Sequence, residues 1–178
     1  MTDRSQLIEG LERSAAGFTA AFQGLTAAQF HFKPGPDRWS IAETAEHVIV
    51  AETGSGKLVR GKLVREEAAP ELIEAARDGA AKVDRRLLKR DTPFPAPDFV
   101  VPTGRWSTPD EMIAVFDESR QATIVFLKAT PLDLTRFVAL HPALGPLNGE
   151  GWLLFLIRHC VRHIDQIEET KAAPGYPG

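Results

Sequence analysis

The chain has 178 residues, enough for one domain with a substantial buried core. Its hydrophobic content of 43% and charged content of 25% are typical of a globular protein. The net charge of -3, without an obvious basic face, gives no reason to expect nucleic-acid binding. Its single cysteine, Cys160, excludes an internal disulfide framework. The N-terminus has no apolar signal core, and the longest apolar run, residues 152–157, is too short to span a bilayer. We therefore expect a cytoplasmic protein.

The first half of the chain predicts two long helices. In residues 4–28, apolar side chains recur at spacings of three and four and form one stripe: Leu7, Leu11, Ala15, Phe18, Phe22 and Leu25. The second helix begins near Ser40, which forms an S-x-x-E capping box with Glu43, and continues toward residue 63. Gly54 and Gly56 weaken this helix midway, so a bend or a close packing contact is expected there.

Residues 70–89 favour a helix but contain few large apolar side chains, which predicts a peripheral helix. The four prolines within residues 92–104 exclude a helix and predict an extended connection over the surface. The third core helix begins after Thr108, with Pro109 as its first residue and Glu111 completing a second capping box, and it ends near residue 130.

The last core helix is predicted to begin after Asn148 as its cap and to run to about residue 170. It follows a turn-rich loop, residues 141–149, and we expect no strand anywhere in the chain. The fold class is therefore all-α. Residues 1–170 form one four-helix bundle domain with an extra peripheral helix and a long loop between the second and third core helices, and residues 171–178 form a flexible tail.

Two histidines on the last predicted helix are candidates for metal binding. His159 and His163 lie four residues apart, so they share one helix face and can reach one ion. The spacing alone fits equally a core histidine beside a solvent-facing one. His47, on the second helix, has small and mixed neighbours that suit a cavity wall. It lies off the centre of the apolar stripe, so periodicity leaves its direction open. His31 and His141 fall in turn segments, where exposure or backbone hydrogen bonds are the usual outcome.

A dinuclear carboxylate centre is excluded because it requires Glu-x-x-His on two helices. The residues three positions before the candidate histidines are Thr44, Leu156 and Cys160. Gln166, three residues after His163, can accept a hydrogen bond from an imidazole and fix its tautomer, although a surface position explains it equally well.

Cys160 is expected to be a small buried hydrophobe rather than a ligand or nucleophile. Glu43 lies one helical turn before His47 and is the nearest candidate for a general base or a ligand, but its capping role already explains its presence.

Three passages of the chain resemble the DinB/YfiT-like superfamily. They are residues 37–48 with DRWSIAE and EHV, residues 104–112 with GRWS, and residues 141–167 with HPALGPL, EGWLLF and H-x-x-x-H-x-x-Q-I. The resemblance implies a four-helix bundle that holds one divalent metal ion through His47, His159 and His163. It further implies nickel or zinc foremost, with iron or manganese as alternatives, and a homodimer.

The implied activity is that of a metal-dependent hydrolase, or of a transferase that uses a low-molecular-weight thiol, acting on a small-molecule substrate. The alternative is a non-catalytic metal-binding or small-ligand-binding stress-response protein. Structural metal sites usually have four protein ligands, and three named ligands favour an open site. We expect the outer wall of its pocket to include the proline-rich loop, Trp106 and the His141 loop. We expect no nucleic-acid or membrane partner.

Overall fold

Four long helices form the bundle in the computed structural model, which describes residues 3–89 and 96–178. They are α1 (Arg4–Ala20), α3 (Ile41–Lys57), α6 (Pro109–Ala129) and α7 (Gly149–Lys171). The all-α four-helix bundle predicted from the sequence is therefore confirmed. Residues 90–95, which include part of the predicted extended connection, lie outside the described residues.

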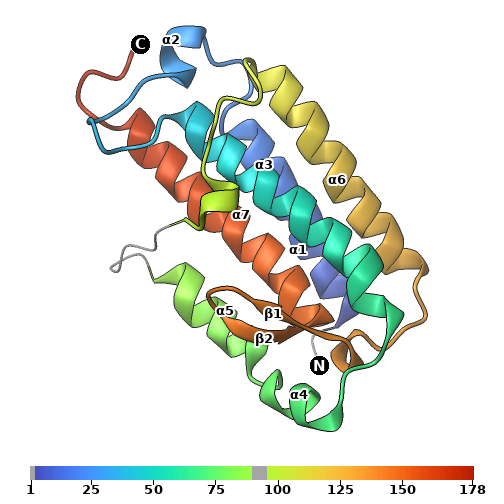
Figure 1. The fold of residues 1–178 in the computed structure, drawn as a ribbon. Coiled ribbons are helices and arrows are strands. Elements are labelled where there is room, and N and C mark those ends of the chain that lie inside the picture. Colours follow the sequence, from blue (N-terminus) through green and yellow to red (C-terminus); the bar gives the residue numbers. More distant parts are fainter. Residues whose placement is uncertain (1–2, 90–95) are drawn as a thin grey trace.

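The order of the helices around the bundle explains its long connections. α1 packs against α6 and α7, and α3 packs against the same two helices, so α1 and α3 are diagonally opposite. α1 and α7 run in one direction, while α3 and α6 run in the other (Figure 1). Because α3 and α6 are parallel neighbours, the chain must return along the length of the bundle between them. It does so through α4 (Pro70–Ala75), α5 (Gly79–Leu88) and the short 3-10 turn η3 (Asp98–Val100).

The predicted helix starts are confirmed at the atomic level. The Ser40 hydroxyl accepts the Glu43 N–H at 3.2 Å while the Glu43 carboxylate accepts the Ser40 N–H at 2.8 Å. Thr108 and Glu111 form the second reciprocal box at the start of α6. Asn148 Oδ1 accepts the Gly151 N–H at 2.8 Å and caps α7. Local sequence thus determines where the bundle helices begin.

Two helix boundaries differ from the prediction. The first helix ends at Ala20 rather than near residue 28, and a turn through Gly24 (φ 73°) leads to the short α2 (Ala27–Phe30). The second helix reaches residue 65 as predicted in extent, but it changes after Lys57 into a π-helical turn η1 (Leu58–Lys62) and a 3-10 turn η2 (Leu63–Arg65). The close contact predicted in its glycine region is present, because a Cβ on Gly56 would lie 3.0 Å from Thr123 Oγ1 of α6.

The segment 70–89 is more than a peripheral helix. It forms two helices, α4 and α5, and α5 buries Val83 and Leu87 while it packs along α7. Asp84 of α5 pairs with Arg158 of α7 at 2.6 Å. The extra helix predicted outside the four core helices is therefore present, and a few apolar residues on one side of α5 are enough to pack it against α7.

The expectation of no strand was also wrong. Residues 138–148 form an antiparallel hairpin, β1 (Val138–His141) and β2 (Gly145–Asn148), in which Val138 pairs with Asn148 and His141 with Gly145. Gly145 has φ 75°, which lets the chain turn back at the start of β2. The hairpin was not predicted because turn-forming residues outnumber strand-forming residues in this segment, which therefore resembles a loop. The 3-10 turn η4 (Leu134–Arg136) precedes it.

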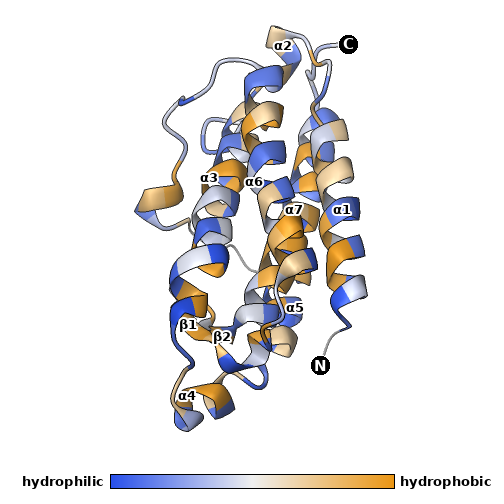
Figure 2. Cartoon of the chain, turned by 90° about the vertical axis from the view of Figure 1, so that its right-hand side faces the viewer, coloured by the Kyte–Doolittle hydropathy of each residue, from blue (hydrophilic) through white to orange (hydrophobic). Residues whose placement is uncertain are grey.

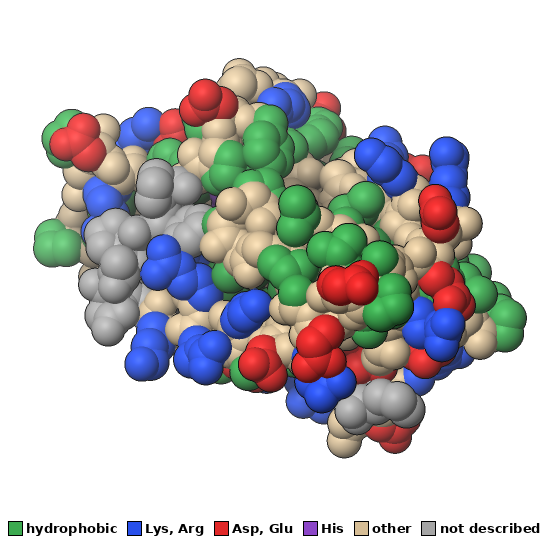
Figure 3. All heavy atoms as spheres, turned by 60° about the horizontal axis from the view of Figure 1, so that its bottom comes forward, with side chains coloured by type: hydrophobic (Ala, Val, Ile, Leu, Met, Phe, Trp, Pro, Cys, Tyr) green, Lys and Arg blue, Asp and Glu red, His purple; other side chains and the backbone are tan. Residues whose placement is uncertain are grey.

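The apolar core consists of two clusters at opposite ends of the bundle. The cluster at the hairpin end contains Leu7, Val83 and Leu147, and the other contains Phe18 and Phe116. Figure 2 shows hydrophobic residues gathered along α7, which lies among the other helices. Hydrophobic side chains also spread over the face of the hairpin end, beside Lys and Arg side chains (Figure 3).

The C-terminal residues make contacts with the segment after α1. The ring of Tyr176 lies 5.5 Å from that of Phe32, and Gln29 Nε2 donates to the carbonyl of Pro177 at 3.3 Å. The flexibility and the domain division expected at residue 170 stay predictions. Among the described residues, no helix is both long and apolar enough to cross a membrane.

Candidate metal centre

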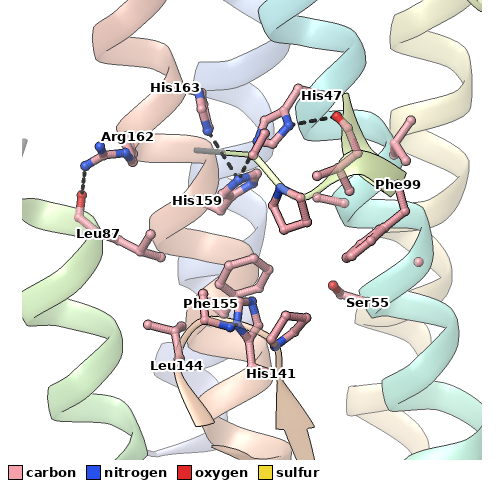
Figure 4. A pocket seen from close by; sticks show the side chains of 18 of the residues that line it. His47, Ser55, Leu87, Phe99, His141, Leu144, Phe155, His159, Arg162 and His163 are labelled. Atoms are coloured by element: carbon pink, nitrogen blue, oxygen red, sulfur yellow. Dashed lines mark hydrogen bonds between the residues drawn. The ribbon is translucent and has the colours of Figure 1, made fainter. Parts of the chain in front are cut away.

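Three histidines from two helices meet in the interior of the molecule. His47 on α3 lies 3.1 Å from His159 on α7, measured between their Nε2 atoms, and His159 lies 3.2 Å from His163 Nε2. One ligand atom of each of the three lies within 4.8 Å of those of the other two. The four-residue spacing on α7 thus places both imidazoles on the face that α3 covers (Figure 4).

Hydrogen bonds on the far side of two rings determine which nitrogen faces the cluster. His47 Nδ1 lies 3.0 Å from the carbonyl oxygen of Val100, and His163 Nδ1 lies 2.9 Å from Gln166 Oε1. Both oxygens can only accept, so each Nδ1 carries a proton, and in the neutral form of each ring the lone pair lies on Nε2. The hydrogen bond predicted for Gln166 is therefore present.

The three Nε2 atoms cannot satisfy one another by hydrogen bonding. With the protons of His47 and His163 held at Nδ1, only His159 can offer a proton at Nε2, and it can donate to one neighbour. Two or more lone pairs then converge in a buried space. A divalent cation accepts all three lone pairs at once, so the donor set fits a metal ion and explains the arrangement.

All three histidines are buried, and burial favours the neutral form of His47 and His159. Their exposed fractions are 6% for His47, 8% for His159 and 7% for His163. Burial lowers the pKa of His47, although the hydrogen bond to Val100 acts in the opposite direction. Burial also lowers the pKa of His159 well below its ordinary value, and the neighbouring His163 and His47 lower it further. Neutral imidazoles are the form that binds metal.

A buried carboxylate holds the loop that orients His47. Glu46 is 2% exposed and accepts the backbone N–H groups of Thr103 at 2.7 Å, Gly104 at 2.8 Å and Arg105 at 3.2 Å. The Arg105 guanidinium adds an ion pair at 2.6 Å. Although burial raises the pKa of Glu46, these bonds lower it below its ordinary value. These bonds to Glu46 hold residues 103–105, and so the nearby Val100, whose carbonyl accepts the hydrogen bond from His47.

The three histidines open onto a pocket of about 730 Å³. Its wall is mainly apolar and includes Trp39, Leu58, Leu87, Phe99, Leu144 and Phe155. Such a volume and lining suit a small organic molecule. Val50 and Ala51 line it too, as predicted for the small face of the second helix. The proline-rich loop and the His141 loop form part of the wall as expected, whereas Trp106 packs against the phenylalanine cluster instead.

The structure places the remaining predicted residues as follows. Glu43 bonds the Ser40 N–H and pairs with Lys33 at 2.7 Å, and it is not among the described residues that line the pocket. Its catalytic role therefore stays a prediction. Cys160 is fully buried, and burial raises the pKa of its thiol to about 12, which agrees with a small hydrophobe. His31 is exposed beside Phe30.

Several pocket residues escaped the sequence analysis. Phe155 lies one helical turn before His159 and stacks on it at 5.1 Å, a spacing that the helical periodicity could have shown. Trp39 lies 5.0 Å from the ring of His47. Arg162 Nη1 donates to the carbonyls of Leu87 and Lys89 and links α7 to the end of α5. Glu46, outside the pocket wall, belongs to the EHV passage that carries the family resemblance, but its role was not predicted, since its partners lie some 57 residues away.

The protein is a helical bundle with three buried histidines beside an apolar pocket. Its class is therefore that of bundle proteins whose histidines could hold a metal ion, here between α3 and α7. The chain belongs to the DinB superfamily, whose sequence profile matches residues 10–167. It is 28% identical to the uncharacterized protein YuaE of Bacillus subtilis (strain 168) over 152 residues, which is 84% of this chain and 87% of YuaE.

The fold is similar to that of a solved protein, YfiT from Bacillus subtilis, with a TM-score of 0.60 over 99% of this chain and 91% of YfiT. YfiT is described as a probable metal-dependent hydrolase with an unusual four-helix bundle topology. At 14% identity the likeness shows a common fold. The resemblance to the DinB/YfiT-like superfamily drawn from three sequence passages is confirmed.

Proposed function

We propose that the protein is a metal-dependent hydrolase that holds one divalent ion through His47, His159 and His163. The observation that carries the proposal is the convergence of three buried imidazoles at the inner end of an apolar pocket. The description of YfiT as a probable metal-dependent hydrolase supports the same assignment.

The spacing of the donor atoms supports the proposal. In a tetrahedral zinc site with Zn–N bonds of about 2.0 Å, two ligand nitrogens lie about 3.3 Å apart. Two of the Nε2–Nε2 separations, 3.1 Å from His47 to His159 and 3.2 Å from His159 to His163, agree with that requirement. Two of the three donor pairs thus have the spacing of zinc ligands, and all three ligand atoms lie within 4.8 Å of one another.

The chain's own residues prepare the site for hydrolysis. Val100 and Gln166 keep two imidazoles in the tautomer that leaves Nε2 available, and the wall of the pocket is mainly apolar. A divalent ion bound there would lower the pKa of a bound water or thiol and polarise a carbonyl group. The pocket wall places the substrate beside it.

An open site distinguishes this proposal from a purely structural metal. Structural zinc sites usually have four protein ligands. In the part of the chain that the structure describes, the metal-ligand cluster contains three histidines and no fourth Cys, Asp, Glu or His. The site faces the pocket, which leaves a coordination position for water or substrate.

Metal analysis of the purified protein tests the first half of the proposal. Elemental analysis should find about one divalent ion per chain, and His163→Ala should lose it while the helical circular-dichroism signal is kept. Protein that takes up neither nickel nor zinc after chelation would refute the proposed function. A variant that loses both metal and fold would instead identify a structural ion.

Activity screens test the second half. The metal-loaded protein should hydrolyse members of an ester and amide panel, and His163→Ala should not. A parallel panel of low-molecular-weight thiols with electrophiles tests the thiol transfer that the resemblance implies. Inactivity in both panels would support the non-catalytic binding protein. The nickel or zinc identity and the homodimer stay predictions, which metal analysis and light scattering can decide.

A further inference from the structure

His141 lies at the tip of the hairpin and forms part of the pocket wall. Its ring packs 4.5 Å from Phe155 and 5.1 Å from Trp152, measured between centroids. Phe155 in turn stacks on His159, so one phenyl ring separates His141 from the three-histidine cluster (Figure 4). The rings of His141 and His159 are therefore separated by only these two ring contacts, of 4.5 Å and 5.1 Å, a distance that a small organic molecule can bridge.

The tautomer of His141 is determined by its own loop. The backbone N–H of Ala143 donates to His141 Nδ1 at 3.2 Å, so Nδ1 carries the lone pair and Nε2 carries the proton. Burial lowers the pKa of His141 to about 4, which keeps the ring neutral near neutral pH. The ring is half-buried, and within the described part of the chain its Nε2–H group donates to no protein acceptor.

A neutral imidazole with one fixed proton is a directed hydrogen-bond donor. The surrounding wall is apolar, with Leu144 and Phe155 beside the ring (Figure 4). A ligand that fills this part of the pocket loses its water, and any acceptor atom it brings must find a donor in the wall. His141 therefore selects for a molecule that combines an apolar body with an oxygen acceptor.

We propose that the pocket binds a small acyl compound, apolar in its body, whose carbonyl oxygen accepts a hydrogen bond from His141 Nε2–H. His141 is thus a substrate-binding residue that contacts the acyl group from the side opposite the three histidines. This inference rests on the proposed function, because it names the substrate class of the same site.

Phenylacetamide and ethylbenzene are suitable probes, because they share a phenyl ring and a similar size but only the amide has a carbonyl. Their dissociation constants are measured by ligand-observed NMR on the full chain, both zinc-loaded and metal-free. His141→Phe, which keeps an aromatic ring without the donor, should weaken phenylacetamide binding about tenfold and leave ethylbenzene binding unchanged. His141→Gln, which keeps an N–H donor, should restore part of the affinity.

A second readout follows the histidine directly. In long-range ¹H–¹⁵N spectra, His141 should show the Nε2–H tautomer, and its signal should move with phenylacetamide but not with ethylbenzene. Absence of phenylacetamide binding to the unaltered protein, or equal losses for both probes in His141→Phe, would overturn the proposal. Because probe binding is also measured in the metal-free protein, the role of His141 can be refuted independently of the proposed metal site.

Discussion

In the three-histidine cluster, a hydrogen bond on the opposite side of the ring determines which nitrogen of His47 and of His163 faces the other histidines. For His163 the bonding partner is the side chain of Gln166, one turn later on the same helix. A side-chain partner can be removed without disturbing the backbone, whereas the partner of His47 is the carbonyl of Val100. Substitution of Gln166 therefore tests how the ring of His163 is oriented, whereas no side-chain substitution removes the partner of His47.

Gln166→Leu should weaken zinc binding by about 10- to 100-fold, because His163 then lacks the acceptor that holds its proton at Nδ1. Competition with a chelating dye measures the affinity. Gln166→Glu keeps an oxygen acceptor and serves as the matched control, with affinity at or above that of the parent protein. Equal affinity of the Leu variant and the parent would show that His163 is held by its packing alone.

The buried histidines also predict a pH dependence for the metal-free protein. The pKa values of His47 and His159 are lowered by burial in the folded state from the ordinary value of 6.5 expected in the unfolded chain. Below pH 6.5 the unfolded chain therefore binds more protons than the folded one, and stability falls as the pH falls. Well above pH 6.5, His47 and His159 are neutral in both the folded and the unfolded state, so they no longer lower the free energy of unfolding.

Urea unfolding of chelator-treated protein checks this sign. The midpoint should be lower at pH 5.5 than at pH 7.5, and His159→Leu should show a smaller difference between the two values. Zinc at saturating concentration should raise the midpoint at pH 7.5, since it binds only the folded site. A midpoint that stays level or rises toward pH 5.5 would contradict the burial of neutral imidazoles.

At the scale of elements, the site depends on a loop that is tied to the helix it covers. Glu46 accepts hydrogen bonds from Thr103 and Gly104 of the loop, while the adjacent His47 donates to Val100 of the same loop. The helix α3 and the loop are thus joined by two adjacent residues. The orientation of a metal ligand therefore depends on a carboxylate that does not itself belong to the three-histidine cluster.

Glu46→Gln should loosen this loop and weaken zinc binding by about tenfold, because an amide has one acceptor oxygen and no charge for the Arg105 guanidinium. Hydrogen exchange of the amides of residues 103–105 should become faster. Glu43→Gln on the same helix is the matched control and should leave both readouts near those of the parent. Unchanged exchange in Glu46→Gln would show that the loop is held by its apolar contacts.

Local sequence predicted the elements whose cause is local. The capping residues Ser40, Thr108 and Asn148 begin α3, α6 and α7 as expected, because each cap depends on atoms within three residues. The pairing of His159 and His163 followed from helical spacing for the same reason. The cluster of these two with His47 came from the family resemblance.

Features with distant causes could not be predicted in this way. His47 lies off the apolar stripe of α3. Its side chain is held in the cluster by a hydrogen bond to Val100, in a loop more than 50 residues later in the chain. The hairpin forms because Leu147 is buried at the end of the bundle, a contact that its proline- and glycine-rich sequence does not reveal. The role of Glu46 likewise depends on partners beyond residue 100.

For the whole molecule, one buried guanidinium joins the four bundle helices. Arg120 of α6 donates to both carboxylate oxygens of Glu52 of α3 at 2.8 Å each. It also donates to Leu11 O and Ser14 Oγ of α1 and to Cys160 Sγ of α7. Both Arg120 and Glu52 are about 1% to 2% exposed. The network lies within the bundle: α6 supplies the guanidinium, α1 supplies two acceptors, and α3 and α7 supply one residue each.

The contributions of this ion pair to stability and to specificity can be separated by substitution. Arg120→Met leaves the Glu52 carboxylate buried without its partner, and we expect it to lower the free energy of unfolding by about 3–5 kcal/mol. Replacing both residues, as Arg120→Met with Glu52→Leu, removes the unpaired charge and should recover most of that loss, because two apolar side chains of similar volume fill the space.

Urea unfolding measures all three proteins, and zinc affinity reports whether α3 and α7 keep their register. The double variant should regain stability; if it also binds zinc like the parent, packing alone sets the register. If it regains stability but loses zinc affinity, the ion pair serves chiefly to align the helices that carry His47 and His159. A double variant as unstable as Arg120→Met would contradict the charge-burial argument, since the loss would then come from packing around the missing side chains.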